Sequence, residues 1–433
     1  MAGGPISFAA TLRLNTERDD VLIVGGGVIG LACAHALALR GRRVRLLERG
    51  RIGAGASQGN CGLVTPSHAL PLNVPGLPRK VMGWMFRSDS PVYWRPRPDL
   101  RLLNWGRHFL ARCNERDMLQ AMHGRAALLQ ASREQYDALF AANDLACEWL
   151  ESGLLVVYRT QAAMHATAAL EAHLKDVGIE PEELDAGEVQ AREPALRDEV
   201  QGGHFFACDA ELRPDALVAG WAEVVRKAGV ELVEECAVEG FEVGASRVDA
   251  VRTVRGRMPA REVVIATGAW SPQLGRALGL AVPVQPGKGY TLTLPRPAIC
   301  PRFPLLLKER NCAVTPWGSG LRLGGTMEFS GYRERLDPRR LAAIRASVAE
   351  YLREPGAGLP AEEWTGWRPM TWDELPILGR SPRHENVCLA TGHGMLGVSM
   401  APASGRLIAE LVCGAAPHLD PAPYAPARFA RGR

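Results

Sequence analysis

The chain has 433 residues, 47% of them hydrophobic, and a formal net charge of +4. A chain of this length is too long to fold around one hydrophobic core, so we expect two domains packed closely together. Lysine and arginine are spread along the chain and nearly balanced by acidic residues, which excludes the electrostatic footprint of a nucleic-acid-binding protein.

The ten cysteines occur singly, without a CxxC pair or a His–Cys cluster at metal spacing. We therefore predict reduced thiols, no metal site and a cytoplasmic location. No window approaches the roughly 18 uninterrupted apolar residues of a membrane span. Residues 1–19 lack the basic start and apolar core of a secretory signal, so we expect an N-terminal extension there. Peripheral attachment to the inner face of the plasma membrane stays open.

The first elements form a strand–turn–helix–strand pattern. Residues 21–24 are a continuous apolar run, typical of a strand buried on both faces of a parallel sheet. A helix is predicted from about Ile29 to Gly41, and a second strand over 44–48. The turn between strand and helix carries a GxGxxG motif and is predicted to bind a dinucleotide pyrophosphate at the helix N-terminus. The predicted contacts in this turn are Gly25, Gly27, Val28, Ile29 and Gly30.

Glu48 ends the second strand, where a carboxylate can accept hydrogen bonds from ribose hydroxyls and disfavours NADP. The small-residue loop at 54–62 follows, and its amides and Ser and Asn side chains suit phosphate and the polar edge of an isoalloxazine. This loop favours FAD over NAD; the alternatives are a Gly-rich turn of another α/β protein and an ordinary flexible loop. The cofactor contacts predicted here are Glu48, Arg49, Ala56, Ser57, Asn60, Gly62 and Leu63.

The remaining elements mix helical and antiparallel patterns. The basic, tryptophan-rich segment 79–110 contains several prolines and no clean amphipathic period, which favours a crossover packed on the second domain over a membrane-surface or partner patch. We expect a helix over 117–146, strands over 154–158 and 263–268, antiparallel strands over 283–294 and 312–326, and a helix over 400–415.

Several motifs, in order along the chain, resemble the D-amino acid oxidase superfamily of flavoproteins, which includes glycine oxidase, sarcosine oxidase, D-amino acid dehydrogenase and D-hydroxyproline dehydrogenase. The resemblance is strongest at 364–379, which is similar to the pattern WxGxRPxTxDxxPxxG, and at 391–397, which is similar to a GHxxxG loop. The other matching stretches are 193–196, Asp209 with 213–215, 266–271 and 324–328.

The resemblance implies a fold of class α/β plus α+β, in which a Rossmann-like FAD domain of discontinuous segments carries an antiparallel-sheet substrate domain. The implied FAD-binding segments are 20–85, 195–275 and 363–433. The implied substrate domain comprises 86–194 and 276–362.

The resemblance also implies roles for individual residues. Arg368 would hold the substrate carboxylate, with Tyr290 replacing a tyrosine that glycine oxidase has elsewhere, and His393 would support its loop. No cysteine lies in 364–372, where sarcosine oxidase attaches its flavin, so FAD is expected to be noncovalent. The further cofactor contacts implied are Val238, Thr267, Gly268, Trp270, Gly392, Gly394, Met395, Leu396 and Gly397.

The implied function is an FAD-dependent dehydrogenase that oxidises a D-amino acid to its imine by hydride transfer to flavin N5, with D-proline or D-hydroxyproline favoured. Arg322 stands where sarcosine oxidase has an oxygen-activating lysine, so a quinone or a carrier protein is the expected electron acceptor. The alternatives are a glycine- or sarcosine-type oxidase that releases peroxide, the flavin subunit of a heteromeric complex, and an NAD-binding protein. A homo-oligomer is compatible with each.

Overall fold

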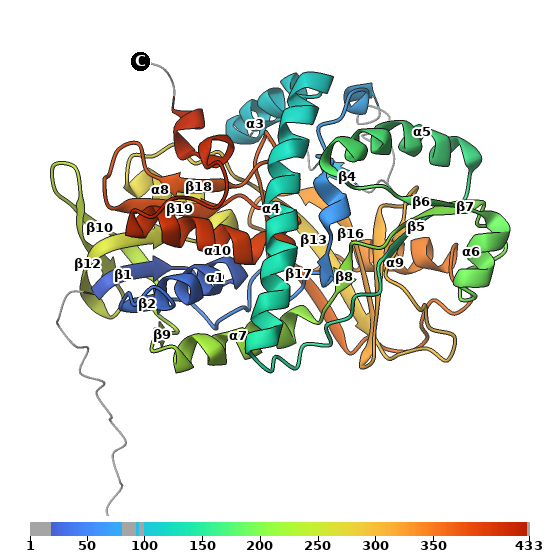
Figure 1. Cartoon of the computed structure of the whole chain (residues 1–433), viewed down its shortest axis with the longest axis horizontal. Helices are drawn as coiled ribbons and strands as arrows, with labels where there is room; N and C mark the ends of the chain where they lie inside the picture. Colours follow the sequence, from blue (N-terminus) through green and yellow to red (C-terminus); the bar gives the residue numbers. More distant parts are fainter. Residues whose placement is uncertain (1–18, 80–91, 95–98, 431–433) are drawn as a thin grey trace, which may run out of the picture.

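The computed structural model describes residues 19–79, 92–94 and 99–430. Residues 1–18 of the predicted extension and parts of the segment 79–110 lie outside the described residues. Two sheets at opposite ends of the molecule form the core, and the long helix α4 (Glu115–Ala142) crosses between them (Figure 1). A short ribbon of β3 (Leu63–Val64) and β8 (Ala210–Glu211) lies between the sheets.

The first sheet is built around β1 (Asp19–Val24), which runs parallel to β2 (Val44–Leu47) on one side and β12 (Gly256–Ile265) on the other. The parallel order continues with β9 (Glu231–Val233) beside β2 and β19 (Val387–Thr391) beside β12. The antiparallel strands β10 (Val238–Val243), β11 (Val248–Thr253) and β18 (Ile377–Arg380) complete it. Residues 21–24 are buried, as a strand covered on both faces requires.

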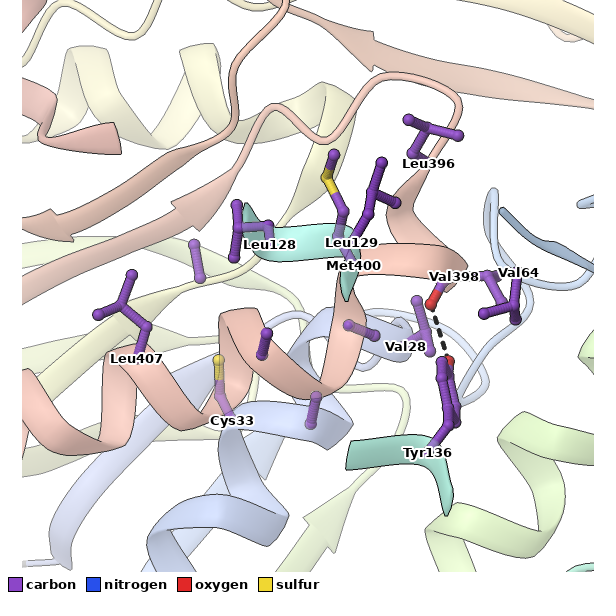
Figure 2. Packing of buried hydrophobic residues seen from close by; sticks show 14 of the residues in the cluster. Val28, Cys33, Val64, Leu128, Leu129, Tyr136, Leu396, Val398, Met400 and Leu407 are labelled. Carbon is purple, nitrogen blue, oxygen red and sulfur yellow. Dashed lines mark hydrogen bonds between the residues drawn. The ribbon is translucent and has the colours of Figure 1, made fainter. Parts of the chain in front are cut away.

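Helices α1 (Val28–Ala38) and α10 (Gly397–Cys413) pack against each other on this sheet, and α4 packs on α10. Figure 2 shows the shared core, in which Val28 and Cys33 of α1 lie near Met400 and Leu407 of α10. The hydroxyl of Tyr136 on α4 donates to the Val398 carbonyl over 2.8 Å. The predicted helices at 29–41, 117–146 and 400–415 are thus confirmed with shifted ends.

The second sheet has the strand order β17-β13-β16-β15-β14-β5-β7-β6, and only the β14–β5 pair along this path is parallel. This arrangement confirms the predicted antiparallel second domain. Its strands are β17 (Glu362–Met370), β13 (Gln285–Leu294), β16 (Gly320–Phe329), β15 (Cys312–Trp317), β14 (Leu305–Leu307), β5 (Leu154–Tyr158), β7 (Gly202–Phe206) and β6 (Glu182–Asp185), with β4 (Val92–Trp94) pairing on β16.

Helix α9 (Pro338–Ala349) packs on β13, β15 and β16 and closes the apolar core of the second sheet on one face. The opposite face is turned toward the first sheet. In the described residues, the remaining α-helices are α3 (Leu100–Ala111), α5 (Gln161–Glu171), α6 (Ala186–Arg192), α7 (Pro214–Lys227) and α8 (Ser271–Ala277).

Strand pairing moves two of the predicted segment boundaries. We placed 195–275 and 363–433 with the first domain, but β7 pairs with β5 and β17 pairs with β13, so both strands belong to the second sheet. The long-range hydrogen bonds of these strands decide their sheet, and such pairings leave little trace in a local pattern. In the described part of the chain, no helix combines the length and the apolar character needed to cross a membrane.

The packing of α1 on α10 generates a prediction about Gly405. A Cβ atom added there would lie 2.4 Å from the carbonyl carbon and 2.5 Å from the oxygen of Ala32 on α1, and backbone cannot rotate away. We expect Gly405→Ala to force the helices apart and lower the free energy of unfolding by about 1–3 kcal/mol, as overpacked cores do, measured by urea denaturation.

The matched control is Gly220→Ala on α7, where the added methyl group would meet only a side-chain methyl of Leu145, at 2.9 Å. This control should change stability much less. Equal free energies of unfolding for the two variants would show that the contact between α1 and α10 tolerates an added methyl group.

Candidate functional site

The predicted cofactor residues meet at one edge of the first sheet. Strands β1, β2, β12 and β19 are parallel, so their carboxyl ends lie side by side. Gly25 follows β1, Glu48 follows β2, Thr267 follows β12 and Gly392 follows β19. In open α/β sheets, ligands bind at this edge.

The turn after β1 needs glycine for two different reasons. Gly25 has a φ of +112°, and a Cβ atom there would lie 2.5 Å from the Ala266 oxygen on the neighbouring strand. A Cβ atom on Gly30 would lie 1.9 Å from the Gly25 oxygen, so glycine allows α1 to begin directly against the turn. At the N-terminus of α1, the Val28 N–H donates to Ser57 Oγ over 3.0 Å. The remaining first-turn amides and the helix dipole face the site, which suits a pyrophosphate.

The Glu48 carboxylate is fixed in place by backbone amides. Its Oε2 accepts from Gly26 N–H over 2.7 Å, and its Oε1 accepts from Gly50 N–H over 3.0 Å. Each oxygen keeps a free lone-pair site. Beside it, the Arg49 guanidinium lies 3.8 Å from the ring centroid of Trp270, an interaction that the sequence motifs did not reveal.

The loop at 54–62 is anchored by Arg322, a residue of β16 that is 1% exposed. Its Nη1 donates to the carbonyls of Gln58 (2.8 Å) and Asn60 (2.9 Å). Its Nη2 pairs with Glu362 at 2.7 Å, and its Nε donates to Thr293 Oγ1 at 3.0 Å. The guanidinium therefore holds the loop against the second sheet, and Arg322 itself does not line the cavity.

The N-terminus of α10 faces the same site. Leu396 caps the helix without a side-chain hydrogen bond, so the first amides are not blocked by a cap. His393, just before it, is 5% exposed and its Nε2 lies 3.0 Å from Ser404 Oγ. Burial lowers the pKa of His393 to about 3, so the ring is neutral at physiological pH.

Arg368 on β17 lies across the neighbouring strand β13. A Cβ atom on Gly289 would lie 2.4 Å from the guanidinium carbon, so the absence of a side chain there makes the position of Arg368 possible. Arg368 Nη1 donates to the Thr326 carbonyl over 2.8 Å and approaches Met327 Sδ at 3.9 Å. Among the described residues, no carboxylate forms an ion pair with Arg368. Burial lowers its pKa below the ordinary arginine range, with a small opposing effect from Cys61.

Tyr290 does not join Arg368, which corrects the expected substitution for the missing tyrosine. Successive side chains of a strand point to opposite faces, and Gly289 already faces the guanidinium. Tyr290 therefore points into the apolar core beneath the sheet, where it is fully buried and donates to Glu328 over 2.8 Å.

These elements line one continuous cavity of about 1100 Å³, slightly larger than the roughly 300–1,000 Å³ common for ligand pockets. Three predicted glycines, Gly30, Gly62 and Gly392, lie behind its wall and shape the backbone. The predicted residues that line it are Gly25, Gly27, Val28, Ile29, Glu48, Arg49, Ala56, Ser57, Asn60, Leu63, Val238, Thr267, Gly268, Trp270, Arg368, His393, Gly394, Met395, Leu396 and Gly397.

The lining also contains residues that the sequence reasoning missed. Trp364 and Trp367 lie inside the motif that identified Arg368, and only the motif's arginine was interpreted. Gly59 and Gly366 leave room for the Trp364 indole, since a Cβ atom on either would meet the ring within about 2 Å. In the described part of the chain, no group of three or more His, Cys, Asp or Glu side chains is arranged to hold a metal ion.

A buried carboxyl lies behind the cavity wall. Asp209 is 1% exposed, accepts from Ser67 N–H (3.0 Å) and Ser67 Oγ (2.5 Å), and has no ion-pair partner among the described residues. His68, which lines the cavity, lies 3.2 Å from the same hydroxyl. Burial raises the pKa of Asp209 to about 7, against the opposing effect of its hydrogen bonds. The hydrogen bonds from Ser67 to Asp209 therefore hold the segment that follows the loop at 54–62 in place.

Comparisons with known proteins agree with this geometry. A family model described as FAD dependent oxidoreductase matches residues 20–411. The D-amino acid dehydrogenase of Granulibacter bethesdensis is 34% identical over 417 residues, which is 95% of this chain and 99% of that protein. The D-amino acid dehydrogenase of Methylobacterium nodulans is 35% identical over 422 residues, 94% of this chain and 99% of that protein.

Among solved structures, glycine oxidase from Geobacillus kaustophilus superposes with a TM-score of 0.79 at 25% identity, covering 96% of this chain and all of that one. The L-proline dehydrogenase from P. horikoshii has a TM-score of 0.75 at 19% identity, covering 97% of this chain and 100% of that chain, and supports the fold alone.

The position of Asp209 generates a prediction about pH. Its pKa is about 7 in the folded protein and has an ordinary value of 3.8, so between these values the folded state holds a proton that unfolding releases. The free energy of unfolding should therefore fall as pH rises from about 4 to 7, by up to about 4 kcal/mol from this group. Asp209→Asn removes this contribution, which chemical denaturation at several pH values can measure.

Glu211 is the internal control, because burial raises its pKa to about 8 and Asp209 is not among the groups that shift it. Its contribution cancels when the two stability curves are subtracted. A difference curve that stays flat between pH 4 and 7 would contradict the assignment to Asp209.

Proposed function

The chain belongs to the family of FAD dependent oxidoreductases, and we propose that it is a dehydrogenase that oxidises a D-amino acid to its imine. The name of the relatives that match almost its whole length supports the substrate class. FAD, when bound, supplies the two-electron acceptor for the hydrogen on the substrate α-carbon. The residues of this chain supply binding, orientation and electrostatics.

The single observation that carries the proposal is that the Arg368 guanidinium has an incomplete set of hydrogen-bond partners in the cavity. A largely buried guanidinium without an acidic partner is costly unless a ligand completes it. Arg368 lines the cavity, and its Nη1 contacts the Thr326 carbonyl and Met327 Sδ, whereas its Nη2 and Nε have no acceptor among the described residues. Its planar fork is suited to a carboxylate. We therefore assign the substrate carboxylate to Arg368.

The residues at the strand-end edge fit FAD. The α1 N-terminus would bind the pyrophosphate, Glu48 would accept from a ribose, and the loop at 54–62 would contact the phosphate and the ring. The uncapped N-terminus of α10 would stabilise negative charge on the pyrimidine side of the ring. We propose noncovalent binding, which acid precipitation tests by releasing the flavin into the supernatant.

The position of Arg322 supports an electron acceptor other than oxygen. The guanidinium is neutralised by Glu362 and faces the loop at 54–62 instead of the cavity. The side chain of Arg322 therefore places no positive charge beside a reduced flavin. We propose a quinone or a carrier protein as the acceptor, and rapid peroxide release would instead identify an oxidase.

The proposed reaction predicts the response of the bound flavin to a panel of amino acids. The purified holoprotein should be bleached by D-amino acids under anaerobic conditions, and the L-enantiomers should leave it oxidised. D-Proline and D-hydroxyproline, which the sequence resemblance favours, belong in the panel with D-alanine and sarcosine. Reoxidation by a quinone analogue should outpace reoxidation by air. Bleaching by sarcosine alone, or no bleaching by any D-amino acid, would contradict the proposal.

The assignment of the substrate carboxylate to Arg368 predicts the kinetics of two variants. Arg368→Ala should retain FAD and raise the KM for a D-amino acid by about 10- to 100-fold, the loss expected for one charged hydrogen-bonded pair. Gly289→Ala should act in the same direction, because its methyl group displaces the guanidinium.

Arg353→Ala is the control, since Arg353 pairs with Asp198 on the surface and does not line the cavity. Its kinetics should match those of the unmodified protein. Unchanged KM values in both Arg368→Ala and Gly289→Ala would refute the assigned role.

A further inference from the structure

The cavity extends past the carboxylate site to the far end of the second sheet. Ala313 of β15 pairs with Leu306 of β14, and Leu306 pairs with Val156 of β5. The three residues line the cavity as a cross-strand row about 10 Å long, which is two strand spacings. Helix α5 packs on β5 and β7 at this end of the sheet (Figure 1). We call the space between α5 and this row the α5 lobe, which is lined by Val156, Ala163, Ala166, Leu170, Leu174, Phe206, Leu306 and Ala313.

The α5 lobe is separate from the carboxylate site at Arg368. Cys61 Sγ covers Gly324, the residue of β16 that pairs with Ala313, since a Cβ atom on Gly324 would lie 2.2 Å from that sulfur. The lobe also has an opening of its own, because Ala166 lines the cavity and is exposed on α5. A second small molecule can therefore reach the lobe without passing through the carboxylate site.

The segment 63–68 connects the proposed flavin-binding loop with the lobe. Thr65 N–H donates to Ser399 Oγ over 3.3 Å, which attaches the segment to the start of α10. The residues of this segment that line the cavity are Leu63, Thr65, Ser67 and His68. One short stretch of chain thus runs from the cofactor edge to the lobe.

His68 and Lys308 form a polar end of the lobe. Lys308 lines the cavity two residues after Leu306, and its N–H continues the strand pairing by donating to the Val157 carbonyl over 3.1 Å. Burial lowers the pKa of His68 to about 3, and the charges of Lys308 and Arg125 lower it further. The His68 ring is therefore neutral and lies within reach of the field of Lys308.

The carboxylates that line the cavity beside the lobe are bound by protein groups. Glu171 Oε2 lies 2.5 Å from His204 Nδ1. Glu309 accepts from Arg159 N–H over 2.9 Å and from Tyr351 Oη over 2.7 Å. The lobe therefore combines apolar walls with a polar end, a pattern that suits a flat apolar ligand carrying carbonyl oxygens.

A chain of three side chains connects the lobe to the buried Asp209. Ser67 Oγ lies 2.5 Å from Asp209 Oδ2 and 3.2 Å from His68 Nδ1. Within the described part of the chain, His68 Nε2 has no hydrogen-bond partner, and the ring lines the cavity. The groups that act on Asp209 from other directions are the thiol of Cys208, at 3.5 Å, and Arg133 of α4.

This chain can pass a proton to a ligand in the lobe. When Asp209 is protonated, it donates to Ser67 Oγ, and the Ser67 hydroxyl then donates to His68 Nδ1. The ring proton of His68 is then on Nε2, which can donate to a ligand oxygen. A transfer moves one proton between each pair of neighbours and leaves Asp209 ionised. His68 is neutral before and after the transfer, in agreement with its low pKa.

We propose that the α5 lobe binds a quinone as the electron acceptor, and that Asp209, Ser67 and His68 deliver a proton to a quinone oxygen. This inference rests on the proposed oxidation of an amino acid with an acceptor other than oxygen. A quinone takes up two electrons and two protons to become a quinol. The hydrogen removed from the substrate α-carbon supplies both electrons and one proton, and Asp209 supplies the second proton. A carrier protein does not fit a space that lies between α5 and the sheet.

Binding of menadione, a compact quinone, tests the site by equilibrium dialysis against the oxidised holoprotein. Ala163→Phe fills the lobe from α5, and Ala313→Leu fills it from the sheet. Each should raise the Kd by about 10-fold or more, the effect of losing the contacts of roughly two methylene groups.

Ala162→Phe is the matched control, because Ala162 precedes Ala163 on α5, is exposed and does not line the cavity. It should leave the Kd for menadione unchanged. An unchanged Kd in both lobe variants, with FAD bound and a normal melting temperature, would overturn the proposed site.

The proton relay is tested by the rate at which menadione reoxidises the photoreduced protein. Asp209 has a pKa of about 7, so it carries a proton below pH 7, and the rate should fall as pH rises through 7. Ser67→Ala removes the middle group of the chain. It should lower the rate at about pH 6 by about 100-fold, as loss of a positioned acid does, and flatten the pH profile. Asp209→Asn should flatten it in the same way.

Cys208→Ala is the control for the relay, because the thiol contacts Asp209 from outside the three-residue chain. This variant should keep the fall in rate with rising pH. A pH profile that persists unchanged in both Ser67→Ala and Asp209→Asn would contradict the relay.

Anaerobic bleaching by a D-amino acid separates this inference from the proposed reaction, because bleaching requires the carboxylate site and no quinone. The lobe and relay variants should bleach at the rate of the unmodified protein. If no D-amino acid bleaches the flavin while the lobe variants weaken menadione binding, the reaction is contradicted and the quinone site is supported. Normal bleaching, with menadione bound equally well by both lobe variants, would contradict the quinone site alone.

Discussion

The guanidinium of Arg322 joins the two sheets at the cavity, and the rest of the site depends on that junction. The residue belongs to the second sheet, and it donates to the carbonyls of Gln58 and Asn60 in the loop behind the first. Glu362 and Thr293, from its own sheet, complete its hydrogen bonds. A buried charge is stable only when such partners are all present. They come from the second sheet and from the loop at 54–62, which follows β2 of the first sheet, so the charge is satisfied only when that loop is packed against the second sheet.

Arg368 belongs to the same sheet but, unlike Arg322, lacks a complete set of hydrogen-bond partners. It lines the cavity and, in the described residues, meets one backbone carbonyl and no carboxylate. The hydrogen-bond partners distinguish the two roles where the residue type cannot, because both residues are arginines of one sheet, Arg322 fully buried and Arg368 half-buried. Arg322 holds the loop at 54–62 in place from behind the cavity wall, and Arg368 lines the cavity, where a ligand can reach it.

The local part of the site could be predicted from the sequence because its causes are local. A strand, a turn that only glycine allows at Gly25 and Gly30, a helix and Glu48 follow one another within about thirty residues. The apolar runs and alternations likewise gave the types of the main elements. Tyr290 was placed wrongly because the residue type was considered without the strand's alternation, and Gly289, one residue earlier, already fixed which face meets Arg368.

The part that could not be predicted depends on register between distant strands. Val156, Leu306, Ala313 and Gly324 lie on four strands that are far apart in the chain, and a shift of one residue in any pairing would turn that strand's side chain to the opposite face. None of these residues is chemically distinctive. Their alignment nonetheless forms the cavity floor along the second sheet. The cofactor edge therefore depends on local motifs, and the cavity floor depends on strand register.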